Sequence, residues 1–270
     1  MILETSRGPI ELRELRNIQD MEAAEEIQRQ VWGLDVCPHP KEWLIPTQQE
    51  GGCLAGAFTS QGEMVSLVFS FPTRDPAIQH SQLLATIEEW RSLGIGTRLK
   101  WFQRSWCLEH GVTLLRWTVD PLRAANAEIN INHLGGIAST FYPDYYGRMN
   151  GIDAGGPTDR LLLEWHLLSP RVIQCANTAP DDREYPGAQP VNYLENEEPH
   201  LTIPLPVSAQ VKLLIPGQYI KLAQADPALA MAWRMQVRQA LMGYFELGYA
   251  ITHFTRQGGP AYLLEKRSIL

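Results

Sequence analysis

The stretch from His80 to His110 constrains the fold of this chain most strongly. A strand is expected over His80–Ile87 and a helix over Gly96–His110, with the turn Arg91-Ser92-Leu93-Gly94-Ile95-Gly96 between them. The first N–H groups of a helix have no intrahelical partner, and the helix dipole places partial positive charge beside them. The two glycines allow the main chain to approach a ligand oxygen closely. The stretch therefore predicts a strand–turn–helix unit that can hold a phosphate group, with Arg91, Arg98 and Lys100 adding positive charge.

The elements on either side of this unit are indicated by the spacing of apolar residues. Alternation with polar residues indicates strands, and spacing by three or four indicates helices. One helix is expected from its cap at Asp20 to Gly33, and another after Arg123. Strands are expected over Ile10–Leu15, 53–58, 64–71, Leu114–Val119, Ile137–Tyr146 and Leu161–Leu168. This order predicts a mixed α/β sheet with a central parallel portion.

The composition changes after this first domain, which we expect to span residues 1–168. Residues 169–200 are rich in proline and acidic side chains and are expected to form a linker or surface-wrapping loop. Residues 201–270 predict a small β-α-β-β unit with a strand over Gln210–Ile215 and a hairpin over Tyr249–Phe254 and Ala261–Lys266. The helix between them has Asp226 as its N-cap and Pro227 at its first position, and Gly248 lies just past its end. This unit is small, so we expect it to dock on the first domain or on a second subunit, as in a homodimer.

Charge and cysteine usage exclude several classes of protein. With 23 Lys and Arg against 30 Asp and Glu, the net charge is −7, unlike that of a nucleic-acid-binding protein. No run of 18 apolar residues predicts a membrane span, and no signal peptide is recognised. The four cysteines lack metal-site spacing, and His39 is expected to be a loop residue. We therefore expect a cytoplasmic protein with free thiols, no bound metal and no membrane or nucleic-acid partner.

A dinucleotide site is the competing interpretation of the glycine turn. Leu99 occupies the place of the third glycine of that fingerprint, and the strand ends six residues before Gly94 rather than directly before it. Asp120 does end the next strand, where a ribose-binding acid would lie. A dinucleotide-dependent oxidoreductase is therefore the remote alternative.

The segment HSQLLATIEEWRSLGIGTRLKWFQRSWCLEHGVTLLRWTVDP resembles the acyl-CoA-binding core of the GNAT acyltransferases. Arg91, Gly94 and Gly96 match the [QR]-x-x-G-x-[GA] signature of that superfamily, and the element order from Ile10 to Leu168 matches its fold. With WTVDPLRAANAEININ and LGG, the chain is similar to a bacterial branch with an extra C-terminal unit. The resemblance implies a mostly antiparallel twisted sheet whose central parallel pair splays around the cofactor.

The same resemblance implies an activity. It is transfer of an acetyl or other short acyl group, such as succinyl, from coenzyme A to the primary amine of a small molecule, an amino acid among them, by direct attack on the thioester. A backbone N–H near Leu84 or Ala85 would donate to the developing oxyanion. The implied cofactor-binding residues are Leu84, Ala85, Arg91, Ser92, Leu93, Gly94, Ile95, Gly96, Thr97, Asn126 and Asn130.

The proton-transfer residues are less well defined. His80, with Glu88 and Glu89, is a candidate general base. Ile131 stands where many members of the superfamily carry an acidic tyrosine, so Tyr145 and Tyr146 are the candidate acids, although the thiolate can leave without one. This departure keeps open a non-catalytic protein that binds or senses acyl-CoA.

Overall fold

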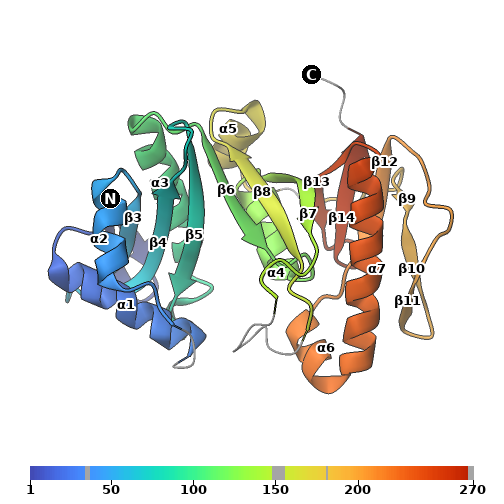
Figure 1. Cartoon of the computed structure of the whole chain (residues 1–270), viewed down its shortest axis with the longest axis horizontal. Helices are drawn as coiled ribbons and strands as arrows, with labels where there is room; N and C mark the ends of the chain where they lie inside the picture. The colour runs from blue at the N-terminus through green and yellow to red at the C-terminus, as the bar shows by residue number, and fades with distance from the viewer. Residues whose placement is uncertain (34–36, 148–155, 181, 267–270) are drawn as a thin grey trace. The chain divides into compact units, whose positions relative to one another are not determined.

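The computed structural model describes residues 1–33, 37–147, 156–180 and 182–266. It divides into two compact units (Figure 1). Unit 1 consists of Met1–Trp117 with His166–Ser169, and the described part of unit 2 consists of residues 118–147, 156–165 and 170–266. The boundary lies inside the strand β6 (Leu114–Val119) and follows contacts rather than composition. The predicted division at residues 168 and 200 stays a prediction.

The sheet of unit 1 is an antiparallel meander that ends in a parallel pair. Each strand from β1 to β5 pairs antiparallel with the next, and β6 joins β5 in parallel. The bounds are β1 Ile2–Thr5, β2 Gly8–Glu14, β3 Leu54–Thr59, β4 Met64–Pro72, β5 Ile78–Thr86 and β6 Leu114–Val119. The hairpin, the strand before the glycine turn and β6 are confirmed.

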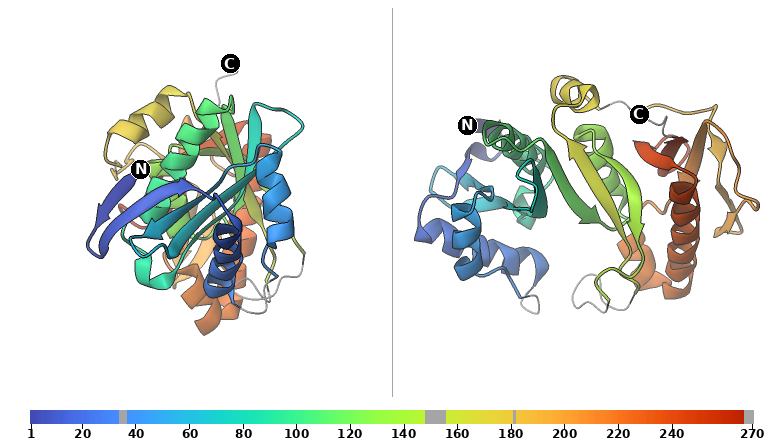
Figure 2. Two further views of the ribbon diagram at one scale, coloured as in Figure 1. Left: turned by 90° about the vertical axis from the view of Figure 1, so that its left-hand side faces the viewer. Right: turned by 45° about the horizontal axis from the view of Figure 1, so that its top comes forward.

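Helices cover both faces of this sheet. α1 (Ile18–Trp32) and α2 (Lys41–Gln49) pack on one face, and α3 (Ile95–Glu109) packs on the other (Figure 2, left). Apolar side chains of α1, α2 and β3–β5 form the core on the first face. The predicted cap of α1 is wrong, because the helix begins after Asn17, whose Oδ1 accepts the N–H of Asp20. The Asp20 carboxylate is engaged elsewhere, by the guanidinium of Arg13 and the N–H of Arg16.

Unit 2 is built on a second set of strands. β7 pairs antiparallel with β8 and β13, β14 pairs antiparallel with β13 and β12, and β9 joins β12 in parallel, while β10 and β11 form a separate hairpin. The bounds are β7 Ile137–Tyr142, β8 Arg160–His166, β9 Gln189–Pro190, β10 Asn192–Glu195, β11 Glu198–Leu201, β12 Gln210–Leu214, β13 Tyr249–Thr255 and β14 Ala261–Lys266. The predicted C-terminal hairpin is confirmed, and most of the described strand pairings are antiparallel, while β5–β6 and β9–β12 are parallel.

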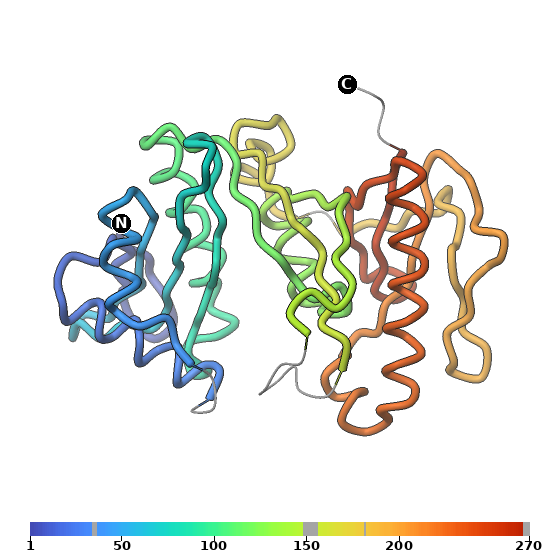
Figure 3. The backbone as a smooth tube through the Cα atoms, in the orientation of Figure 1, coloured from blue at the N-terminus to red at the C-terminus, as the bar shows by residue number. Residues whose placement is uncertain are grey.

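The helices of unit 2 partly match expectation. α7 (Pro227–Glu246) lies along β13 (Figure 3). Asp226 caps this helix by accepting the N–H of Leu229, as predicted. The helix after Arg123 is short, α4 (Ala124–Ala127), and continues as a π-helix, η2 (Glu128–His133). The expected loop over residues 169–200 is wrong in part, since it contains α5 (Pro170–Asn177) and β9 to β11. α6 (Tyr219–Ala225) was not expected.

A search of the described helices for long apolar segments finds none that could cross a membrane.

Candidate functional site

The turn between β5 and α3 forms a cradle of main-chain N–H groups. Ser92 and Gly94 both have left-handed backbone conformations, with φ of 62° and 75°. Gly94 is the N-cap residue of α3, and the first helical hydrogen bond runs from the N–H of Arg98 to its carbonyl oxygen. Across the described residues, the N–H groups of positions 92–97 have no hydrogen-bond acceptor. These groups and the helix dipole favour an anion at this point.

The glycines of the turn serve different purposes. Gly94 has a positive φ that a side chain would oppose, although a Cβ there would meet no atom within 4 Å. A Cβ on Gly96 would lie 3.5 Å from both Leu84 Cδ2 and Thr86 Oγ1, which is ordinary contact. The chain itself therefore requires glycine at position 94 for its backbone angle, whereas the fold would accept a small side chain at position 96.

β5 continues the cradle with an unpaired edge. In the described structure its parallel pairing with β6 covers only Ile78–His80. The N–H of Ile87 donates to Val65 on β4, so by the alternation of antiparallel strands the N–H of Ala85 also points toward β4. The N–H groups of Leu84 and Thr86 consequently lie on the other edge, where the Thr86 carbonyl accepts Arg91 Nε at 3.0 Å. Of the two predicted oxyanion donors, only Leu84 points to the open edge.

His80 lies on the face of β5 that α1 and α2 cover. It is half-buried, and its ring stacks on that of Phe71 with 5.1 Å between the ring centroids. Its register partner on the neighbouring parallel strand β6 is Arg116. Burial lowers the pKa of His80, and the positive charges of Arg116 and Lys100 lower it further. An imidazole that is neutral at neutral pH can accept a proton, which suits a general base.

Neighbouring side chains extend this face. Gln82 occupies a bulge in β5, and its Nε2 lies 3.4 Å from His39 Nε2. The His39 ring meets Phe69 edge-on at 5.4 Å, and burial lowers the pKa of His39. His39 is a loop residue, as predicted; in the part of the chain described, no group of three or more His, Cys, Asp or Glu side chains is placed to hold a metal ion.

The remaining predicted residues lie elsewhere. Glu88 and Glu89 are exposed on a short 3-10 helix, η1 (Glu88–Trp90), and the Glu88 carbonyl accepts the N–H of Arg91. The other four belong to unit 2: Asn126, Asn130, Tyr145 and Tyr146. The roles of all these residues stay predictions.

The local environments of the unit 2 candidates are nevertheless defined. Asn126 is exposed in α4, and Asn130 lies in η2 and accepts the N–H of Gly136 at its carbonyl. Tyr145 and Tyr146 are about half exposed, and the Tyr146 hydroxyl lies 2.9 Å from Thr118 Oγ1. Ile131 is buried and cannot supply the proton of the missing tyrosine.

A buried lysine on α3 was not anticipated. Lys100 was expected to add charge beside the turn, but its side chain is buried against the sheet, where Nζ donates to Gln103 Oε1 at 2.8 Å and Ser81 Oγ at 3.0 Å. Burial lowers its pKa to about 7. The spacing of Lys100 with buried Gln103 and Cys107, three and seven residues on, was the available signal.

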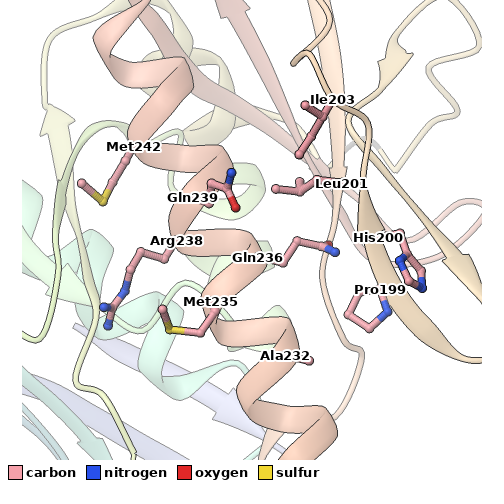
Figure 4. A pocket seen from close by; sticks show the side chains of 10 residues that line it. All are labelled: Pro199, His200, Leu201, Ile203, Ala232, Met235, Gln236, Arg238, Gln239 and Met242. Carbon is pink, nitrogen blue, oxygen red and sulfur yellow. The ribbon is translucent and has the colours of Figure 1, made fainter.

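Hollows are also found outside the cradle among the described residues. In unit 2, a hollow of about 640 Å³ is lined by residues of α7 and β11, with Met235, Arg238 and Met242 on the helix among them (Figure 4). The guanidinium of Arg238 binds the buried carboxylate of Asp159, so this side chain stabilises the fold. In unit 1, a hollow of about 400 Å³ lies between α2 and the end of β4.

Comparisons with known proteins give matches among solved structures. No family model and no curated protein matches the sequence. The structure is similar to solved acetyltransferases. A ribosomal-protein alanine N-acetyltransferase from Escherichia coli aligns with 16% identity and a TM-score of 0.48, over 65% of this chain and 99% of that one. An acetyltransferase of the GNAT family from Streptococcus pneumoniae aligns with 15% identity and a TM-score of 0.48, over 57% and 98%. The yncA protein of Salmonella typhimurium, solved with its cofactor acetyl-CoA, aligns with 15% identity and a TM-score of 0.49, over 64% and 98%.

Proposed function

We propose that this chain is an acyl-CoA-dependent N-acyltransferase of the GNAT type. The acyl group would be acetyl or another short acyl such as succinyl, and the acceptor the primary amine of a small molecule. The observation that carries the proposal is the pair of main-chain donor groups formed by the N–H groups of positions 92–97 and by those of Leu84 and Thr86 on the open edge of β5. The first group suits the pyrophosphate of an acyl-CoA, and the second suits its pantetheine arm and thioester carbonyl.

Coenzyme A fits the chemistry of these groups. The N–H groups of residues 92–97 would hold its pyrophosphate, with Arg91 at the front of the turn. The N–H of Thr86 would pair with the pantetheine arm, and the N–H of Leu84 would donate to the thioester carbonyl. The bound thioester supplies an activated acyl carbon for direct attack by the amine. Asn126 and Asn130 remain proposed cofactor contacts.

The proton chemistry would rest on His80. As the amine forms the new C–N bond and the C–S bond breaks, the neutral imidazole takes the ammonium proton, directly or through water. Glu88 and Glu89 are the secondary candidates for this step. The leaving thiolate is a weak base and can depart without being protonated. The reaction is therefore possible although buried Ile131 stands where many members of the superfamily carry a tyrosine. Tyr145 and Tyr146 stay the candidate acids.

Thiol release across a panel of amines tests this proposal. We expect acetyl-CoA or succinyl-CoA to release free coenzyme A only when an acceptor amine is present, and His80→Ala to slow that release. Tight binding of acyl-CoA without release by any amine would instead indicate an acyl-CoA sensor. Failure to bind any coenzyme A species would exclude both functions. A cytoplasmic location and a homodimer belong to the same proposal.

A further inference from the structure

A groove beside the candidate base combines apolar walls with unpaired carboxylates. We call it the α2 groove, lined by Glu42, Trp43, Pro46, Glu50, Phe71 and Pro72. Its volume is about 400 Å³, and Trp43 is 71% exposed although it is the largest side chain there. Within the described residues, no ion pair or hydrogen bond engages the side chain of Glu42 or Glu50, although Glu42 lies within electrostatic range of Lys41, whose ammonium group is bound to Glu22. An exposed aromatic ring in the same groove as two such carboxylates suits a cation.

The groove is continuous with the reactive face of β5. Phe71 lines the groove and also stacks on His80, with 5.1 Å between the ring centroids. The rings of Phe69 and Phe71 lie 6.3 Å apart, centroid to centroid. His39 contacts Phe69, and Gln82 lies beside His39, so these side chains form a row that reaches the bulge of β5. An apolar chain laid along these rings would join the carboxylates at one end to the candidate base at the other.

The electrostatics differ between the two ends of this row. Arg116 lies opposite His80 and lowers its pKa, and a cation there also disfavours the ammonium form of an amine placed beside His80. The reacting nitrogen would therefore be held ready to lose its proton. At the other end, Glu42 and Glu50 would stabilise a second nitrogen in its charged form.

We infer that the acceptor is a small amine carrying a second cationic group, whose distal end lies in the α2 groove between Glu42, Glu50 and Trp43. This inference rests on the proposed function and narrows its substrate class to diamines and related dications. An acceptor whose distal group is a carboxylate fits less well, because that carboxylate would meet the two glutamates. The reaction is unchanged: the C–N bond forms, the C–S bond breaks, the thiolate leaves, and the ammonium proton passes to His80.

Three acceptors of matched length isolate the contribution of the distal group. Cadaverine, pentylamine and aminovalerate present a cation, a methyl group and a carboxylate, respectively, at the end remote from the reacting amine. With acetyl-CoA and the full chain, we expect kcat/KM for cadaverine to exceed that for pentylamine by about tenfold or more, and aminovalerate to be poorest. Equal turnover of cadaverine and pentylamine would overturn the inference.

A double variant locates the effect in the groove. Glu42→Gln with Glu50→Gln should lower kcat/KM for cadaverine toward the pentylamine value and leave pentylamine and the KM for acetyl-CoA unchanged. Glu109→Gln, an exposed substitution at the end of α3, is the matched control and should change neither acceptor. An equal loss for both amines in the double variant would indicate a structural effect and contradict the inference.

Calorimetry separates the inference from the proposed activity. Cadaverine titrated into the protein with coenzyme A present should bind the parent and the control but not the double variant. Such binding without thiol release would retain the groove and reject the acyltransferase function. Absence of cadaverine binding would reject the groove whatever the activity.

Discussion

Among the single residues, Lys100 has the most unusual environment. Its ammonium group lies 4.0 Å from the centre of the Trp117 ring and donates to Ser81 and Gln103 in a buried part of unit 1. Burial favours the uncharged form, and the pKa falls to about 7 from an ordinary value near 10.5. Gln103 Nε2 beside it is buried and has no partner among the described residues. Burial of this polar cluster lowers the stability of the fold, so replacing Lys100 should change the free energy of unfolding measurably.

Lys100→Met should stabilise the protein most at acidic to neutral pH. The folded pKa lies below the unfolded value, so between about pH 7 and pH 10 the unfolded chain binds more protons and the parent gains stability as pH rises. Below pH 7 the full cost of burying the charge is present. We expect a gain on the order of 3 kcal/mol at pH 6 that shrinks by pH 9, after allowing for the hydrogen bonds lost. Denaturant unfolding at the two pH values measures it, and a gain independent of pH would be inconsistent with this account.

Arg116→Met should shift the pH dependence of turnover. Arg116 is one cause of the lowered pKa of His80, after burial, so removing its charge should raise that pKa toward the ordinary value. If the neutral imidazole is the base, the acid limb of kcat/KM moves to higher pH. His80→Ala should abolish this limb. A limb that stays in place in Arg116→Met would argue for another base, with Glu88 and Glu89 the next to test.

At the scale of elements, the turn before α3 depends on backbone geometry more than on side chains. Gly94 and Gly62 both have positive φ and open space around the position of a Cβ, but Gly62 lies in the β3–β4 hairpin. Alanine at either position should cost roughly 1 kcal/mol of stability, because L residues resist the left-handed conformation. Only Gly94→Ala should also weaken acetyl-CoA binding, since it disturbs the N–H cradle. Unfolding and calorimetry on both variants check this, and equal affinities would remove the turn from the cofactor site.

The elements that were predicted correctly carry their signals locally. The strand at β6, the helix α3, the β3–β4 hairpin and the cap of α7 at Asp226 follow from alternation, helical spacing and capping residues. α2 was missed because Pro46 lies inside it and its apolar residues have no clear period. The cap of α1 was misassigned because Asp20 and Asn17 are both good caps, and only the Arg13 guanidinium decides which one is free to act.

The candidate site was also only partly predictable from the sequence. The N–H cradle is a local consequence of two glycines before a helix, and it was found from the sequence. The choice of Leu84 over Ala85 needs the pairing of β5 with β4, which is fixed by contacts with residues 64–72. The α2 groove joins Trp43 to Phe71, and the burial of Lys100 against Ser81 joins α3 to β5. Such pairs depend on the folded chain, and no short pattern contains them.

At the scale of the whole chain, a net charge of −7 must be reconciled with the polyanionic cofactor that we propose. Main-chain N–H groups and a helix dipole can bind phosphate without a basic surface, and the cradle at residues 92–97 provides both. The acidic balance then favours the opposite charge in the second substrate, as Glu42 and Glu50 do locally. The two substrates would be recognised by different means, the donor by the backbone and the acceptor by side chains.

Thermal unfolding of the full chain distinguishes this arrangement from a dinucleotide site. A ligand at about 100 times its Kd stabilises the folded state by about 2.7 kcal/mol, which for a protein of this size shifts the Tm by several degrees. We expect acetyl-CoA and coenzyme A to produce such a shift and NAD to produce none. NAD also carries a pyrophosphate, but Leu99 stands where a dinucleotide site has its third glycine. Gly94→Ala should reduce the shift with acetyl-CoA, and Gly62→Ala should retain it. A shift with NAD that equals the one with acetyl-CoA would contradict the assignment of the turn to coenzyme A.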